Sequence, residues 1–249
     1  MSDNKGGLIR LGILMVFLGI AMIAAFIKGY KIRSYSKELP TSKVRSAAIG
    51  PIELKGKIIP SQKTVVSNFS NEKCVYTSFI IQKKVGSGKR RHWSTIVNDL
   101  RSEYFFLKDE TGNILVDSKK AIVHTGSNRF IYSSRVKGEK RIIFDRICAK
   151  HGIKVKAFIG RRAVRMKEIN ILADAKNIYL LGYAKKSIFN KKGEIQKLMV
   201  KYKKDLPYII STRGEKAVQR KFGKEWTLIA GIILILGGIT FTILQFYIY

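Results

Sequence analysis

The sequence is poor in the residues that bind structural zinc. It contains two cysteines, Cys74 and Cys148, and three histidines, His92, His124 and His151. A structural zinc ion takes four such ligands in closely spaced pairs such as C-x2-C, and no such pair occurs here. We therefore expect no metal site. The two cysteines are compatible with one disulfide or with two buried thiols, and we favour the thiols.

Acidic residues are also scarce. The 249 residues include 17 Asp and Glu against 48 Lys and Arg, a formal net charge of +31. The charges outside 28–224 are Asp3, Lys5, Arg10 and Glu225, which sum to zero, so the central segment carries the whole surplus. Such a field attracts anionic partners, such as lipid headgroups or nucleic acid. An A/T-rich genome would also favour Lys, Ile and Asn, but it would raise Glu as well, and Glu is not raised.

Catalytic motifs are missing as well. The run VGSGKRR contains GSGK, but a phosphate-binding loop needs a Gly five residues before its second Gly and a Ser or Thr after its Lys. This chain has Lys83 and Arg90 at those positions. We interpret the run as a basic hairpin tip that presents Lys89, Arg90 and Arg91.

Three carboxylates lie close together in DETGNILVD, at Asp109, Glu110 and Asp117. Such groups can transfer protons or bind metals, but Asp-Glu-Thr-Gly between apolar runs is also typical of a tight turn, which we favour. There is no G-x-S-x-G motif, and no histidine or cysteine stands in a recognisable nucleophile context. The sequence predicts no catalytic residue, no cofactor and no enzyme activity.

Two long apolar runs are present: LGILMVFLGIAMIAAFI (11–27) and WTLIAGIILILGGITFTILQFYIY (226–249). Each is about long enough to cross the roughly 30 Å hydrocarbon core of a membrane. The first also resembles a cleavable signal peptide, but it is longer than a typical signal core and lacks a clear A-x-A site, so we favour an uncleaved anchor. In the second run, Ala230, Gly231, Gly237 and Gly238 are small enough to let another helix approach closely.

Basic residues flank both runs on the side of the central domain. They are Lys28, Lys31, Arg33, Lys37, Lys216, Arg220, Lys221 and Lys224. The positive-inside rule therefore predicts an integral protein of the cell membrane, with the central domain in the cytoplasm and both termini outside, although Lys5 and Arg10 argue weakly for the reverse. These eight cations and the three at the hairpin tip are our candidate contacts to an anionic surface.

The central segment shows the two-residue period of strands. In PIELKGKII, Ile52 and Leu54 face one way while Glu53 and Lys55 face the other, and Gly56 indicates a bend or bulge. Further strands are predicted at 73–84, 92–99, 104–116, 163–172 and 177–186, the last two a pair joined at ADAK. Helices are predicted at 139–152 and 214–224, the second opened by a capping box of Thr212 and Glu215.

The predicted fold is mainly β (α+β), an antiparallel barrel-like or sandwich domain with accessory helices between two transmembrane helices. We divide the chain into a transmembrane helix (8–28), a basic linker (29–45), a β domain (46–211), a juxtamembrane helix (212–225) and a second transmembrane helix (226–249).

Several runs occur in the order found in a known family. They are SAAIGPIELKGKIIP, KCVYTSFII, HWSTIV, FFLKDETGNILVD and KEINILADAKNIYLLG. In this order they resemble the GIDE, or beside-a-membrane, domain, which lies between two transmembrane helices in membrane-anchored RING ubiquitin ligases of the MAPL type. Prokaryotic relatives lack the RING. This sequence has Ala173-Asp174-Ala175 where the family usually has Pro or Gly, and it ends at Tyr249 without a RING, so the resemblance implies no ligase residues here.

The sequence thus favours a non-catalytic, membrane-apposed module that binds a protein or anionic lipid headgroups, and two spans are compatible with a homo-oligomer. One alternative is an accessory component of an E3 ubiquitin-ligase-like system with a separate RING partner. Another is a membrane-tethered binder of nucleic acid or anionic lipid. For nucleic acid the support is charge, Trp93 and scattered aromatic residues, without an RNP or helix-turn-helix motif.

Overall fold

The computed structural model divides the chain into two units. The residues it describes are 2–86, 88–126, 130–153, 164–187, 190–191, 194–195, 198–222 and 226–247. One unit combines residues 1–38 with 215–249, and the other spans residues 39–214 and contains the strands.

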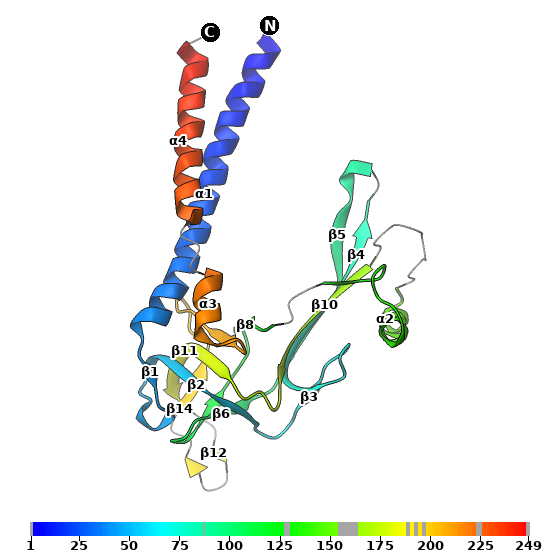
Figure 1. Cartoon of the computed structure of the whole chain (residues 1–249), viewed down its shortest axis with the longest axis vertical. Helices are drawn as coiled ribbons and strands as arrows, with labels where there is room; N and C mark the ends of the chain where they lie inside the picture. Colours follow the sequence, from blue (N-terminus) through cyan, green and yellow to red (C-terminus); the bar gives the residue numbers. More distant parts are fainter. Residues whose placement is uncertain are drawn as a thin grey trace. The chain divides into compact units, whose positions relative to one another are not determined.

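The first unit consists of two long helices and a short one. α1 (Ser2–Glu38) and α4 (Trp226–Tyr247) run antiparallel beside each other, with both chain termini at the same end of the pair (Figure 1). α3 (Gly214–Phe222) packs beside the C-terminal part of α1. There the Gln219 side-chain amide donates to the carbonyl oxygen of Ser36 at 3.3 Å.

Both long helices are long and apolar enough to cross a membrane. The candidate spans fall within Ile9–Glu38 and Gly214–Gln245, and only 12% and 11% of their apolar windows are buried inside the protein. Exposed apolar surface of this extent is typical of membrane-spanning helices and of protein interfaces. The segment 29–45, predicted as a basic linker, is helical as far as Glu38.

Glycines face each other where α1 and α4 pack. A Cβ atom on Gly19 would lie 2.7 Å from the carbonyl oxygen of Gly231, and one on Gly238 would lie 2.8 Å from that of Gly12. These distances are shorter than van der Waals contact, so the approach requires glycine. The predicted role of Gly231 and Gly238 in close packing is confirmed, whereas Gly237 faces open space.

Five strands of the second unit close into a barrel. They are β2 (Gly50–Pro60), β6 (Phe105–Lys108), β7 (Asn113–Val116), β11 (Ile178–Lys186) and β14 (Leu198–Lys201). The ring runs β2, β6, β7, β14, β11 and back to β2, and every pair is antiparallel except β7 with β14. In chain order the third and fifth barrel strands are parallel and the fourth pairs with the first, as in the OB-fold. The predicted fold class is confirmed.

Shorter strands extend this sheet. β1 (Thr41–Ser42) lies parallel to β2. β15 (Ile209–Ser211) joins β11 and pairs in parallel with β8 (Ile122–His124). A separate two-stranded sheet contains β12 (Asn190–Lys191) and β13 (Glu194–Ile195). β11 therefore bonds β2 along one edge and β14 and β15 in succession along the other.

β2 closes the barrel because it changes partner along its length. As far as Gly56 it pairs with β11, and from Lys57 onward it pairs with β6. A Cβ atom on Gly56 would lie 2.4 Å from the carbonyl oxygen of Lys108, so the two strands approach too closely for a side chain there. Gly56, predicted at a bend or bulge, marks this change of partner.

The barrel interior is filled by side chains that alternate along the strands. Leu54 and Leu180 are fully buried there. The same alternation predicts Glu53 on the solvent side, but Glu53 is only 2% exposed. Tyr179 Oη and Thr41 Oγ1 each donate to one oxygen of its carboxylate at 2.7 Å. The predicted exposure of Glu53 is wrong, because its neighbours supply the hydrogen bonds that a buried carboxylate needs.

A second sheet forms around one long strand. Its members are β3 (Val65–Val66), β4 (Lys73–Val85), β5 (His92–Ser102), β9 (Ile131–Tyr132) and β10 (Val164–Leu172). β4 pairs with β10 along one edge and with β5 and β3 along the other, and β9 continues the sheet beyond β10. The β4–β5 hairpin extends outward from this sheet (Figure 1).

α2 (Glu139–Lys150) covers one face of the second sheet. Phe144 and Cys148 of this helix pack with Phe79 of β4 and Met166 of β10 in a second hydrophobic core. The predicted helix at 139–152 is confirmed, apart from its last two residues.

The predicted pairing of the strands on either side of ADAK is wrong. β10 pairs with β4 in the second sheet, whereas β11 pairs with β2 in the barrel. The two sheets remain connected because β4 and β10 contribute to both cores. Val75 and Ile171 belong to the barrel core, and Phe79 and Met166 belong to the second core.

The cysteines lie in separate places and are not bonded to each other. Both are buried free thiols, so the interpretation we favoured is confirmed. Burial raises the pKa of Cys74 to about 11 and that of Cys148 to about 11, helped by the nearby Glu72 and Asp145 carboxylates respectively.

Gly19→Ala should destabilise the helix pair, because its methyl group would meet the Gly231 carbonyl oxygen. Overpacking of this kind costs roughly 1–3 kcal/mol. Thermal unfolding of the full-length protein in detergent measures the effect. Gly237→Ala is the matched control, since its methyl group enters open space and the substitution improves helix propensity by about 1 kcal/mol. Equal melting temperatures for the two variants would contradict the packing described.

Candidate functional site

The basic residues that flank the two apolar runs lie on helices that pack together. α3 contacts α1 through Gln219 and Ser36, so the two flanks, far apart in sequence, become neighbours. The exposed members are Lys31, Lys37, Lys216, Arg220 and Lys221, and Arg33 is half-buried. Lys28 belongs to α1 but its side chain is not described, and Lys224 lies outside the described residues. Contact of this set with an anionic surface stays a prediction.

The other predicted cations lie at the tip of the β4–β5 hairpin. A short 3-10 helix, η2 (Gly88–Arg90), connects the two strands, and the side chains of Lys89, Arg90 and Arg91 are exposed. The interpretation of VGSGKRR as a hairpin tip is confirmed, because Val85 pairs with His92 directly below it.

Cations and aromatic rings alternate on the face of the second sheet opposite α2. We call this surface the basic-aromatic face; it contains Lys84, Trp93, Phe130, Tyr132, Arg135, Arg165 and Lys167. The guanidinium carbon of Arg165 lies 4.2 Å from the ring centre of Trp93 and 3.9 Å from that of Phe130. Arg165 Nε also donates to Gln82 Oε1 at 2.7 Å, which orients the stack. Arg165 is thus held between two rings.

Further cations lie over the same rings. Lys84 Nζ is 5.9 Å from the centre of the Trp93 ring, and Lys167 Nζ is 5.4 Å from the centre of the Phe130 ring. The Arg135 guanidinium lies 5.5 Å from the centre of Tyr132, whose ring in turn meets Trp93 edge-on. Cation–π contacts at exposed sites contribute about 0.5–1 kcal/mol each, so several of them order these long side chains.

Side chains alternate between the two faces of this sheet, so the cations of the basic-aromatic face and the acidic residues of β5 and β10 lie on opposite faces. Trp93 lies opposite Lys84, and Arg165 lies opposite Tyr132, so these side chains share a face. Asp99 and Glu168, the acidic residues of β5 and β10, instead lie opposite Phe79, which packs against α2. The basic-aromatic face therefore receives no carboxylate from the strands that form it.

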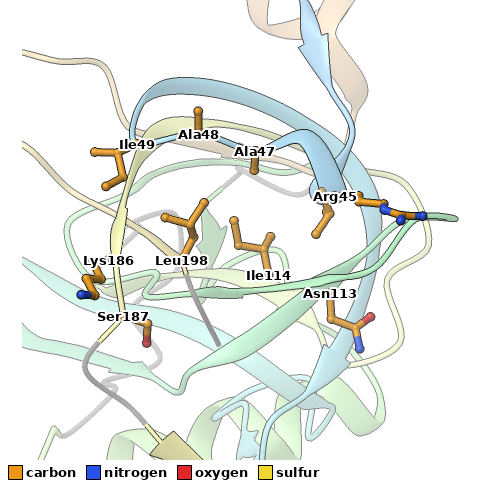
Figure 2. Close-up of a pocket in the computed structure, with 10 residues that line it drawn as sticks. Arg45, Ala47, Ala48, Ile49, Asn113, Ile114, Lys186, Ser187 and Leu198 are labelled. Carbon is orange, nitrogen blue, oxygen red and sulfur yellow. The ribbon is translucent and has the colours of Figure 1, made fainter. Parts of the chain in front are cut away.

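A cavity of about 680 Å³ opens at one end of the barrel, which we call the barrel mouth. Segment 44–49, the strap, crosses above it, while Ile114 of β7 and Leu198 of β14 stand in its centre (Figure 2). Arg45 and Lys186 lie on opposite sides of the cavity. Mouths of β-barrels are frequent ligand sites.

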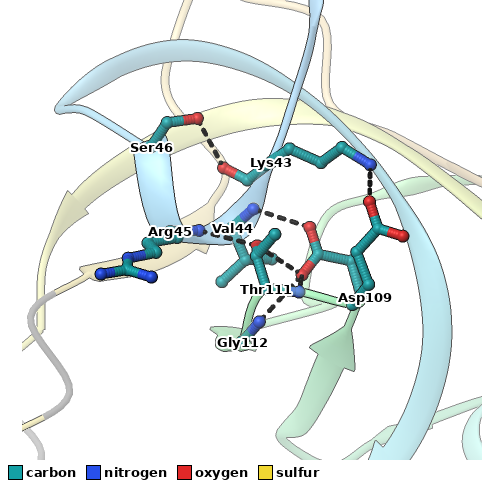
Figure 3. A network of polar contacts seen from close by, with 8 residues as sticks. Lys43, Val44, Arg45, Ser46, Asp109, Thr111 and Gly112 are labelled. Atoms are coloured by element: carbon teal, nitrogen blue, oxygen red, sulfur yellow. Dashed lines mark hydrogen bonds and ion pairs between the residues drawn. The ribbon is translucent and has the colours of Figure 1, made fainter.

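The strap is held by the turn between β6 and β7, as Figure 3 shows. η1 (Val44–Ser46) begins the strap, and the Val44 N–H donates to Asp109 Oδ2 at 2.8 Å. Asp109 Oδ1 accepts from the Thr111 N–H and hydroxyl, both at 2.7 Å, and from the Gly112 N–H at 2.9 Å. The prediction of a tight turn at Asp-Glu-Thr-Gly is confirmed, and its carboxylate anchors a distant segment.

Two further contacts join the turn to the strap. Lys43 Nζ forms an ion pair with Glu110, and the Arg45 N–H donates to Thr111 Oγ1 at 3.1 Å. Asp117 lies apart from them and accepts from the Lys119 N–H at 3.0 Å. Within the described part of the chain, no three His, Cys, Asp or Glu side chains are grouped to hold a metal ion.

The hydrogen bonds around Asp109 decide its protonation. Desolvation alone would raise the pKa of this carboxyl, but the donors from Val44, Thr111 and Gly112 together outweigh it. The pKa of Asp109 is therefore lower than its ordinary value. Asp109 remains ionised over the whole neutral range and keeps the strap in place.

A family model described as GIDE, E3 Ubiquitin ligase, matches residues 80–244, well over half of the chain. The chain belongs to the GIDE family. No curated protein and no solved structure matches it. The GIDE match begins within β4 and ends within α4, so it includes all members of the basic-aromatic face and four of the five barrel strands, all except β2.

Only some of the residues that form the basic-aromatic face and the barrel mouth of this GIDE domain could be predicted from the sequence. Trp93 was noted, but Arg165 and Lys167 were not, although their alternation with Met166 marks a strand with one basic face. Phe130 and Tyr132 carry no such signal, because they join the face only through the pairing of β9 with β10. Arg45 and Lys186 come to line the same cavity only once the barrel closes.

Asp109→Asn should loosen the strap of the GIDE domain, because a neutral amide has one acceptor oxygen in place of two charged ones. Hydrogen bonds to a charged group contribute roughly 1.5–3 kcal/mol each. Hydrogen exchange of residues 43–49 in the full-length protein measures the loss. Since the folded pKa of Asp109 is lowered, its contribution is complete above the ordinary Asp pKa of about 3.9 and disappears as pH falls through the folded value.

Asp174→Asn serves as the matched control, since Asp174 is an exposed carboxylate in the turn between β10 and β11. Exchange at the strap should be the same in this variant as in the unmodified protein. If Asp109→Asn left the exchange of residues 43–49 unchanged, the anchoring role of Asp109 would be refuted.

Proposed function

We propose that this GIDE protein is a two-span membrane protein whose β domain is a non-catalytic interaction module that works against an anionic membrane surface. The observation that supports this most directly is the basic-aromatic face, where positively charged side chains alternate with aromatic rings. Leu100, which shares this face, is 53% exposed. Charge and apolar surface together are what a lipid headgroup layer binds.

Simple magnitudes favour this function. A Lys or Arg near an anionic leaflet contributes about 1 kcal/mol. Lys84, Arg135, Arg165 and Lys167 together would therefore hold the face to anionic lipid at low salt. The attraction would weaken as salt screens it, over a distance of about 8–10 Å at physiological ionic strength. Trp and Tyr rings prefer the headgroup layer, which adds a contribution that salt does not remove.

The same features support nucleic acid less well. Proteins that bind single strands offer free ring faces on which bases stack. Here Arg165 already stacks on both Trp93 and Phe130, and Lys84 and Lys167 also lie over those rings. A lipid headgroup needs only the charges and the amphipathic ring edges, so it requires no rearrangement of the stack.

The family description favours a second function, an accessory component of an E3 ubiquitin-ligase-like system. In that case the GIDE domain would bind a protein partner, and a separate RING protein would supply the catalytic zinc site. This chain itself has two cysteines and three histidines, and the two cysteines do not form a C-x2-C pair.

The proposal places the β domain in the cytoplasm and both termini outside the cell membrane. The basic residues of α1 and α3 support this orientation through the positive-inside rule. External protease added to right-side-out vesicles should leave the β domain intact, and digestion should require that the vesicles be opened. Digestion of sealed vesicles at the β4–β5 hairpin would show the opposite orientation.

Fluorescence quenching tests the membrane contact. The sequence contains two tryptophans, so Trp226→Phe leaves Trp93 as the only one. This full-length variant is placed in nanodiscs that contain brominated lipid, with either neutral or anionic headgroups. Trp93 should be quenched in anionic discs, much less in neutral ones, and the difference should fall as salt is added.

Lys84→Glu with Lys167→Glu should reduce the quenching in anionic discs, while Arg165 keeps the rings in place. Lys57→Glu with Lys204→Glu makes the same change in net charge on exposed side chains outside the face, and it should preserve the quenching. If Trp93 fluorescence were not quenched in either kind of disc, the membrane contact would be refuted.

A further inference from the structure

The barrel mouth has an apolar lining that continues into the barrel core. Ile114 belongs to that core, and Val44, Ala47 and Leu198 pack against it. Ile49, on the strap, is 63% exposed. An open cavity of about 680 Å³ with such walls falls within the size range of small-molecule sites and favours an apolar ligand.

Two cations flank this apolar space. The side chains of Arg45 and Lys186 are exposed on opposite sides of the cavity, and neither has an ion-pair partner among the residues that the structure describes (Figure 2). Some other cations of the domain are paired, as Lys43 is with Glu110 and Arg141 is with Asp145. The rim of the mouth therefore keeps two positive charges available to a ligand.

Two further cations lie close to Lys186 on β11 and β14. Lys185 precedes it, and Lys201 of the neighbouring strand lies against Lys185. The contact with Lys201, and its like charge, lower the pKa of Lys185. Because side chains alternate along a strand and Ala184 and Val200 face the barrel core, Lys185 and Lys201 lie on the outer face, whereas Lys186 lines the mouth. Lys186 is therefore the cation of β11 that can meet an anionic group in the cavity.

We infer that the barrel mouth binds a single-chain amphiphile with an anionic head, its tail against Ile114 and Leu198 under the strap and its head at Lys186. Two sources share this chemistry: a fatty acid with a carboxylate head and a lysophospholipid with a phosphate head. A ligand without a negative head would bury its tail but leave the rim charges uncompensated. A polar anion without a tail would leave the apolar walls exposed to water.

The start of the strap is anchored by the protein itself. Its first turn is anchored by Asp109, and its backbone by Thr111, so the upper wall of the cavity is positioned by contacts that do not involve the ligand. Preorganisation of this kind reduces the entropy lost on binding. The site is independent of the basic-aromatic face, which lies on the second sheet, so it goes beyond the proposed function.

Photo-crosslinking in neutral nanodiscs tests this inference. The full-length protein is incubated with palmitic acid that carries a diazirine on its chain, and the labelled residues are identified by mass spectrometry. Labelling is expected at the barrel mouth, on the peptides that contain Val44, Ile114 and Leu198, besides lipid-dependent labelling of α1 and α4. Labelling confined to those two helices would overturn the inference.

Competition defines the head group. Unlabelled palmitate and anionic lysophosphatidylglycerol should both reduce labelling of the mouth, whereas zwitterionic lysophosphatidylcholine should not. Competition by palmitate alone would restrict the site to carboxylates, and competition by lysophosphatidylglycerol alone would restrict it to phosphates. Equal competition by all three would overturn the role of charge.

Two variants distinguish the contribution of the apolar walls to binding from that of the charged rim. Leu198→Trp fills the cavity and should abolish labelling of the mouth, provided that thermal unfolding shows an intact fold. Lys186→Glu leaves the core untouched and should weaken palmitate binding about tenfold. Lys204→Glu is its matched control, with the same charge change at an exposed position outside the mouth, and should bind as the unmodified protein does. If Lys186→Glu and Lys204→Glu bound equally, the placement of the head would be refuted.

Discussion

The β domain depends on the closure of its barrel by β2, which bonds β11 with its first half and β6 with its second. Closure removes the free edges that these strands would otherwise present. It also determines where the cavity lies. The starts of β2, β7 and β14 and the end of β11 meet at one end of the ring, where the strap lies above the apolar side chains that reach it.

Barrel closure also explains the second sheet. The connections from β2 to β6 and from β7 to β11 are much longer than the barrel needs, and they pair with each other, β4 from one and β10 from the other. Because β4 and β10 each place residues in both cores, the second sheet is a continuation of the barrel fold and not a separate domain. α2 covers one face of this sheet, and the basic-aromatic face lies on the other.

Charge is distributed in this fold by the alternation of side chains along strands. The chain has a formal net charge of +31, and the acidic residues of the second sheet lie on the face that α2 covers. On that face Glu168 accepts hydrogen bonds from the Phe69 and Ser70 N–H groups. The cations on the opposite face are placed over aromatic rings, which orders them without neutralising them. The same division occurs at the barrel mouth, where Asp109 and Glu110 hold the strap from one side and Arg45 and Lys186 remain available on the rim.

The sequence by itself determined the elements whose signal is local. The apolar runs, the strands at 73–84 and 92–99, the helix at 139–152 and the Asp109 turn could all be read from side-chain periods and turn residues, because these depend on neighbours a few positions away. Tertiary structure alone decided the pairing of β10 with β4, the burial of Glu53 and the stack of Arg165 between Trp93 and Phe130. Each of these joins residues that are tens of positions apart, and one strand pattern is compatible with many partners. Only the closure of the barrel and the packing of the two cores select among those partners, since they bury apolar surface and satisfy hydrogen bonds in one arrangement.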